Sequence, residues 1–236
     1  MLFRSHPTRG LLLPDSFIGV AESTNLAAEL GRWVMRSACA ELSRWRSNGV
    51  GQDAIMHINV SPVQLIARGF VSSVADTIEE FGIDGGSVCL EITERAVVRD
   101  IEATRRTLSE LKEVGVQIAI DDFGTGYAVL SHLKSLPVDM LKIDTGFVRD
   151  LGTNTSDLAI VRAIIALAEA FDLQLVAEGV ETPAAAHTLI EHGCHRAQGF
   201  LFSRPVPGDV VESLLSRRRV PMTCFANAEA LSVDAS

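Results

Sequence analysis

The stretch VQIAIDDFGTG, residues 116–126, decides the fold of this chain. Its first five residues are largely apolar without strict alternation, which is typical of a parallel strand buried on both faces. The run ends in two adjacent carboxylates, Asp121 and Asp122. A buried strand that ends in functional side chains is typical of a β/α domain whose site lies at the carboxyl ends of its strands.

Five more short apolar runs share this design. They cover residues 54–60, 87–93, 139–144, 173–179 and 196–202, and in or beside them lie Asn59, Glu91, Glu94, Lys142, Asp144, Glu178 and Gln198. Helical periodicity between the runs predicts helices at 25–46, 62–81, 101–114, 127–135, 157–171, 183–192 and 207–217. Strands alternating with helices predict an α/β fold, a TIM-like (β/α) barrel that is incomplete because six strands are recognisable where eight close the barrel.

Composition and charge bound the function. The 236 residues are 47% hydrophobic with a net charge of −9, so a nucleic-acid partner is not expected. No apolar stretch approaches the ~20 residues of a membrane span, and the four scattered cysteines are typical of isolated thiols in a reducing compartment. We expect a cytoplasmic protein with an irregular lead-in over 1–22, one domain over 1–217 and a loose C-terminal tail over 218–236.

The adjacent carboxylates Asp121 and Asp122 predict a metal site. Two such groups at a buried strand end repel each other unless a cation lies between them. Their hard oxygen atoms suit Mg²⁺ or Mn²⁺, and one aspartate can bridge two ions about 4 Å apart, as in two-metal phosphoester hydrolysis. A solvated turn with a helix cap is the alternative. The glycine-rich loop 124–126 adds little by itself, because it lacks the rest of a phosphate-binding fingerprint.

Three other polar positions stand out. Lys142 lies inside an apolar run, and a buried lysine is costly unless it is paired or functional. His57 lies two residues before Asn59 and shares its face of the strand; we favour a packed core histidine over a ligand. Glu94 and Glu181 follow Glu91 and Glu178 by three residues each, so one member of each pair can face the site while the other braces a loop.

Taken together, these motifs resemble the EAL family of cyclic di-GMP phosphodiesterases. The matching strings are His6–Gly10, Pro14–Ile18, Ile58–Ser61, Glu91–Glu94, Asp121–Gly126, Leu141–Asp144, Ala177–Glu181 and Gln198–Phe200. The resemblance implies a barrel whose first strand is antiparallel to the others. It also implies a signal-transduction hydrolase that cleaves cyclic di-GMP to linear pGpG with two Mg²⁺ or Mn²⁺ ions, Ca²⁺ being inhibitory.

The resemblance also implies roles for individual residues. One ion would be held by Asn59, Glu91 and Asp121, and the other by Asp121 and Asp122. Catalytic roles would fall to Lys142, which orients the nucleophile, to Glu178, which holds a metal or its water, and to Gln198, which supports the same water network. Glu94 and Glu181 would brace the loop that starts at Asp122 and shapes a homodimer contact. An upstream sensory or cyclase domain is a further possible partner.

The sequence departs from the family at its start. Aligning the family's Glu-Ala-Leu-x-Arg-Trp-x-His-Pro motif on His6-Pro7 places Met1 on the leucine and Phe3 on the phosphate-contacting arginine. We therefore expect an N-terminally truncated domain that lacks the metal-binding glutamate and the first two strands, with weak or absent hydrolysis. The alternatives are a catalytically inactive EAL-like module that binds cyclic di-GMP or a protein partner, and a barrel hydrolase for another phosphoester.

Overall fold

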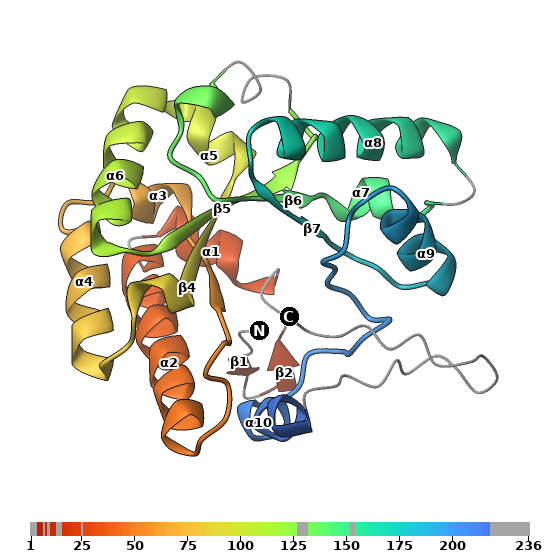
Figure 1. Cartoon of the computed structure of the whole chain (residues 1–236). Helices are drawn as coiled ribbons and strands as arrows, with labels where there is room; N and C mark the ends of the chain where they lie inside the picture. Colours follow the sequence, from red (N-terminus) through yellow and green to blue (C-terminus); the bar gives the residue numbers. More distant parts are fainter. Residues whose placement is uncertain are drawn as a thin grey trace.

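The fold is built on a five-stranded parallel sheet. The computed structural model describes residues 4–6, 8, 10–12, 16–24, 26–126, 132–151 and 154–217. The sheet has the order β3 (Met56–Asn59), β4 (Val88–Thr93), β5 (Gln117–Phe123), β6 (Met140–Ile143) and β7 (Gln174–Ala177), so strands consecutive in the chain are neighbours in space. Helices lie around the outside of this curved sheet (Figure 1).

Ten α-helices are present in the described part of the chain. They are α1 (Ile18–Ser23), α2 (Ala27–Ser47), α3 (Pro62–Leu65), α4 (Phe70–Phe81), α5 (Glu94–Arg99), α6 (Ile101–Val114), α7 (Thr145–Val148), α8 (Thr155–Ala170), α9 (Pro183–Glu191) and α10 (Gly208–Arg217), with 3₁₀ turns at Gly85–Ser87 and Leu133–Ser135. The predicted helices 25–46, 101–114, 157–171, 183–192 and 207–217 are confirmed within two residues at each end. None of the described helices is long and apolar enough to cross a membrane.

Five of the six predicted strands are confirmed, and the sixth, 196–202, is wrong. Its only sheet pairing is one parallel bridge between Ala177 and Ala197. The chain then turns, because the Phe202 amide donates to the Gly199 carbonyl oxygen. A Cβ at Gly199 would lie 2.1 Å from the Val180 carbonyl oxygen, so this close approach requires glycine.

Two further predictions about the local structure are wrong. The helix 62–81 is interrupted at Gly69, whose φ of +77° is left-handed, and it therefore forms α3 and α4. The lead-in is not irregular: β1 (Arg4–His6) and β2 (Gly10–Leu12) form a separate antiparallel hairpin, and α1 follows. Of the predicted helix 127–135, residues 127–131 lie outside the described residues, as does the predicted tail 218–236.

Two of the helices that follow strands, α3 and α9, begin at a polar side chain that caps their first turn. The Ser61 hydroxyl accepts a hydrogen bond from the Gln64 amide at 3.3 Å, and Pro62 occupies the first helical position. Thr182 and Pro183 repeat this arrangement at the start of α9. These caps place helix starts and strand ends at the same edge of the sheet.

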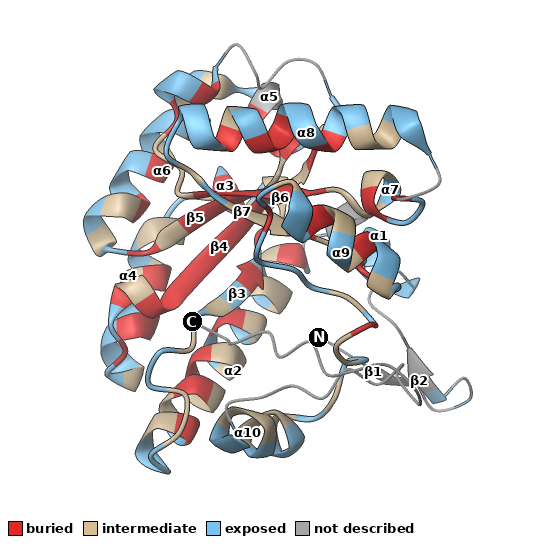
Figure 2. Cartoon of the chain, turned by 45° about the vertical axis from the view of Figure 1, so that its right-hand side comes forward, coloured by how far each residue is buried: buried red, intermediate tan, exposed pale blue. Residues whose placement is uncertain are grey.

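The strands divide the core into two layers. Alternate residues such as Ile58, Leu90 and Ile118 pack with the helices in the main apolar cluster. Figure 2 shows buried residues along the strands and on the sheet-facing sides of the helices. The intervening residues Cys89, Ala119 and Met140 form a second, smaller cluster on the inner face, with Val176 packed against it. The predicted site residues continue along this inner face toward the carboxyl ends of the strands.

Candidate active site

Lys142 is the centre of the site. Its side chain is 3% exposed, and its Nζ lies 2.7 Å from Glu91 Oε1, 3.1 Å from Asp121 Oδ1 and 2.5 Å from Glu178 Oε1. Burial lowers the pKa of Lys142, but the charges of the three carboxylates outweigh it, so the pKa lies above its ordinary value. The ammonium group is therefore charged at neutral pH and links β4, β5, β6 and the end of β7.

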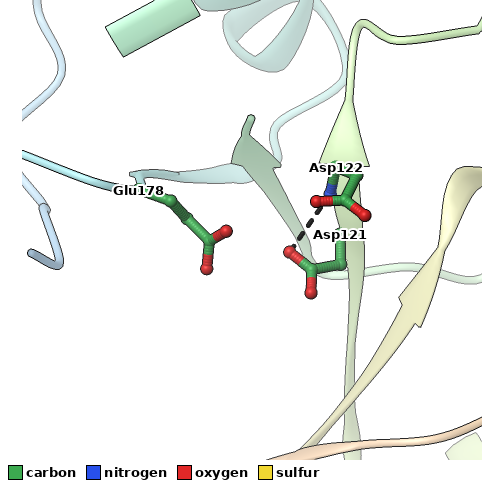
Figure 3. A group of neighbouring side chains, drawn as sticks. All are labelled: Asp121, Asp122 and Glu178. Carbon is green, nitrogen blue, oxygen red and sulfur yellow. Dashed lines mark hydrogen bonds between the residues drawn. The ribbon is translucent and has the colours of Figure 1, made fainter. Parts of the chain in front are cut away.

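Three carboxylates form a compact acidic group. Asp121, Asp122 and Glu178 each offer one oxygen within 4.8 Å of the others, and Figure 3 shows the Glu178 carboxylate extending toward Asp121. Burial raises the pKa of Glu178 to about 7; Lys142 acts in the opposite direction and Asp121 adds to the increase. Burial and the charges of Asp121 and Asp144 likewise raise the pKa of Asp122. These hard oxygen donors carry more negative charge than Lys142 neutralises, so they fit Mg²⁺ or Mn²⁺.

A backbone irregularity brings the two adjacent aspartates into one group. In a regular strand Asp121 and Asp122 would point to opposite faces. The register between β5 and β6 shifts between Ile120 and Phe123, and Asp122 has a left-handed φ of +54°. The Asp122 amide then donates to Asp121 Oδ1 at 3.1 Å (Figure 3). This unusual backbone is typical of a functional site that the surrounding structure holds in place.

Glu91 and Asn59 lie at paired positions of β4 and β3. Glu91 is 4% exposed, and its Oε1 lies 2.9 Å from His57 Nδ1. Burial raises the pKa of Glu91, but the hydrogen bond with His57 and the charge of Lys142 outweigh this, so the pKa is lowered. Asn59 is exposed at the carboxyl end of its strand.

The interpretation of His57 as a packed core histidine is wrong. Its side chain is 33% exposed and paired with Glu91. The reason is the alternation of β3, which buries Ile58 in the main core and leaves His57 and Asn59 on the other face.

Glu94 is placed to hold the loop that follows β5. It is 2% exposed, and its Oε2 accepts hydrogen bonds from the Gly124 amide at 3.3 Å and the Gly126 amide at 3.1 Å. A Cβ at Gly126 would lie 2.8 Å from Glu94 Oε1, so the carboxylate reaches these amides because the loop carries glycine there.

Two predicted site residues have exposed side chains. Gln198 is fixed through its backbone, which donates to the Ala177 carbonyl at 2.8 Å and accepts from the Val180 amide at 3.0 Å, beside Glu178. The Gln198 and Glu181 side chains make no hydrogen bond or ion pair with any other residue that the structure describes. Their assigned roles stay predictions.

Sequence reasoning missed two partners of the site residues. One is the contact of His57 with Glu91. The other is Asp144, whose charge helps to raise the pKa of Asp122 and whose Oδ1 accepts a hydrogen bond from the Gly146 amide at 2.8 Å, capping α7. The sequence places Asp144 at the end of the same apolar run as Lys142, but that position does not predict its influence on Asp122.

Residues 1–205 match the sequence pattern of the EAL domain. The chain belongs to the EAL domain family. Among its curated relatives, Rv1354c of Mycobacterium tuberculosis strain H37Rv is 64% identical over 93% of this chain and 35% of its own length. The bifunctional diguanylate cyclase/cyclic di-GMP phosphodiesterase MucR of Pseudomonas aeruginosa is 41% identical over 86% of this chain and 30% of its own. The chain thus spans about a third of the length of these relatives.

Solved EAL structures share this fold. The EAL domain of Mycobacterium smegmatis DcpA superposes with a TM-score of 0.79 at 67% identity, covering 83% of this chain and 88% of that one. The phosphodiesterase PaMucR in complex with c-di-GMP superposes with a TM-score of 0.86 at 40% identity, covering 89% of this chain and 85% of that one. The predicted α/β, TIM-like class of fold is confirmed.

Proposed function

We propose that this EAL domain is a metal-dependent phosphodiesterase that hydrolyses cyclic di-GMP to linear pGpG. The observation that carries the proposal is the acidic group of Asp121, Asp122 and Glu178 at the carboxyl ends of the strands, with the buried Lys142 ammonium against Asp121 and Glu178. Relatives that share this domain support it: MucR is named above, and NbdA of Pseudomonas aeruginosa, a cyclic di-GMP phosphodiesterase, is 41% identical over 91% of this chain and 27% of its own length.

The acidic site requires divalent cations to accept an anionic phosphodiester. We assign Asn59, Glu91 and Asp121 to one Mg²⁺ or Mn²⁺ ion and Asp121 with Asp122 to the other, with Ca²⁺ inhibitory. Bound cations of this kind neutralise the phosphate and activate water. Glu91 and Asp121 both contact Lys142, so the ligands of the two ions are held in one network.

Lys142 and Glu178 are the groups we assign to the attacking water. The Lys142 ammonium has three N–H donors and contacts three carboxylates, which hold it in place beside Glu178. It would donate to a water when a cation draws one of these carboxylates away. Glu178 is 16% exposed at its side chain, and its pKa of about 7 suits a group that exchanges a proton with water near neutral pH. Gln198, beside the end of β7, would support the same water.

The remaining assignments concern the loop after Asp122. Glu94 holds this loop through two backbone amides, and we propose Glu181 as a second brace. We further propose that the domain acts in the cytosol as part of bacterial second-messenger signalling and forms a homodimer through this loop. Light scattering at micromolar concentration tests the dimer, and a monomeric mass would contradict it.

The test of the proposed function separates ligand binding from turnover. Cyclic di-GMP is titrated into the polypeptide 1–236 with Ca²⁺ by calorimetry, and pGpG formation is then measured with Mg²⁺ or Mn²⁺. We expect binding with slow turnover, because the glutamate of the family's name-giving motif has no counterpart within residues 1–236. Binding without turnover would favour a non-enzymatic cyclic di-GMP module. Absence of both from the folded polypeptide would contradict the proposal.

A further inference from the structure

His57 contacts the site in a way that the proposed roles do not use. Its Nδ1 lies 2.9 Å from Glu91 Oε1, the same oxygen that lies 2.7 Å from Lys142 Nζ. A carboxylate with a lowered pKa is ionised at neutral pH and only accepts hydrogen bonds, so His57 Nδ1 carries the proton and donates it. Two donors therefore meet at one oxygen of Glu91.

The contacts of His57 and Lys142 constrain the whole Glu91 carboxylate. The His57 Nδ1 contact and the short Lys142 Nζ contact both fall on Glu91 Oε1. Because the two oxygens belong to one planar group, holding Oε1 also sets the direction in which Oε2 points.

We propose that His57 is a positioning residue for the cation site: it holds Glu91 Oε1 so that Oε2 is presented to the divalent cation shared with Asn59 and Asp121. The inference rests on the metal site of the proposed function. His57 is suited to this task because it is on the strand next to Glu91, with Asn59 and Glu91 at paired positions. Lys142 alone does not fix Glu91, since its ammonium is shared among three carboxylates.

The expected loss of metal affinity on removing His57 follows from the general behaviour of groups that orient metal ligands. Loss of such a partner typically weakens metal binding about 10–100-fold. His57 is one-third exposed and contributes little to the apolar core, so its replacement should leave the fold intact. The effect should therefore appear in cation affinity rather than in stability.

The test compares two amide replacements. The side-chain nitrogen of asparagine is as many bonds from Cα as histidine Nδ1, whereas that of glutamine corresponds to Nε2. Mn²⁺ is titrated by calorimetry into metal-free wild type, His57→Asn and His57→Gln. We expect His57→Gln to bind about 10–100-fold more weakly and His57→Asn to stay within about threefold of wild type. The control is His187→Ala, which removes an exposed histidine paired with Glu191 on α9 and should not change the affinity.

The outcomes separate this inference from the proposed function. Equal affinities for wild type and both His57 variants, or equal losses in both, would overturn the positioning role even if cyclic di-GMP is hydrolysed. A wild type that binds no Mn²⁺ would overturn it as well. If the variants differ as expected but no pGpG forms, the positioning role stands and the proposed hydrolysis fails.

Discussion

Replacing Lys142 with methionine is the strongest perturbation that the site offers. Methionine keeps an unbranched chain as far as Cε but removes the ammonium charge that faces Glu91, Asp121 and Glu178 at 2.7, 3.1 and 2.5 Å. Removing one partner of a buried ion pair costs about 3–5 kcal/mol, because the other partner stays buried without compensation. Here three carboxylates lose their partner together, so the free energy of unfolding should fall toward the upper end of that range.

The cost should depend on pH and on metal. The pKa of Glu178 is about 7 beside Lys142, and removing Lys142 raises it further, so Glu178 in the variant takes up a proton more readily and relieves part of the repulsion. We expect a loss of about 3 kcal/mol at pH 6, rising toward about 5 kcal/mol at pH 9. A divalent cation can replace the missing ammonium charge. If the variant binds Mg²⁺ about tenfold more tightly than wild type, saturating Mg²⁺ reduces the difference in free energy of unfolding between wild type and variant by about 1.4 kcal/mol.

The assay is urea unfolding followed by circular dichroism, at both pH values and with either EDTA or Mg²⁺. Lys112→Met is the matched control, since Lys112 Nζ lies 2.8 Å from both Asp139 oxygens but its side chain is 33% exposed. We expect the control to lose only about 1 kcal/mol, without dependence on Mg²⁺. A Lys142→Met variant as stable as the control, or one whose loss is the same with and without Mg²⁺, would refute the reasoning.

Three further predictions concern the acidic group, its loop and the last helix. Because cation binding must displace the proton of Glu178, Mn²⁺ affinity measured by calorimetry should rise about tenfold from pH 6 to pH 8. The free energy of unfolding of the metal-free protein should fall over the same interval. The reason is that the raised pKa of Glu178 makes the folded state bind more protons than the unfolded state. A flat affinity profile would argue against Glu178 as the group that holds a cation or its bound water. Gly126→Ala would bring a Cβ within 2.8 Å of Glu94 Oε1 and disturb the carboxylate that holds the loop. The rate of pGpG formation should therefore fall about tenfold, and the free energy of unfolding in urea should fall by about 1 kcal/mol. An unchanged rate would contradict the bracing role of Glu94. Trp45→Phe removes the hydrogen bond from Nε1 to the Gly208 carbonyl oxygen at the start of α10. The free energy of unfolding, measured by thermal unfolding, should fall by about 1 kcal/mol, and Mn²⁺ affinity should not change. Loss of Mn²⁺ binding would contradict this prediction, because it would show that α10 supports the cation site.

The strands that carry the site could be predicted because their pattern lies within a few consecutive residues. Runs such as 116–122 are apolar over the length of a strand and end in carboxylates, so both the element and the chemistry at its end were readable. Ser61 and Thr182, each followed by proline, likewise predicted the starts of the helices after β3 and β7. By contrast, the run 196–202 has the composition of a strand, but the packing of Gly199 against Val180 turns the chain.

Contacts between distant segments could not be read from the sequence. The pairing of His57 with Glu91 depends on the register of β3 and β4, which no local pattern fixes. The shared orientation of Asp121 and Asp122 depends on a register shift and a left-handed residue that strict alternation would exclude. The effect of the Asp144 charge on the pKa of Asp122 requires both strand ends to be in place.

The measurement that tests the account most directly is the location of Mn²⁺ by anomalous scattering in crystals of the polypeptide 1–236 with cyclic di-GMP. The account predicts Mn²⁺ within about 2.0–2.3 Å of oxygens of Asp121 and Asp122, next to the phosphate of the ligand, with Lys142 still beside Glu178. Mn²⁺ bound only elsewhere, or cyclic di-GMP bound away from these carboxylates, would contradict it.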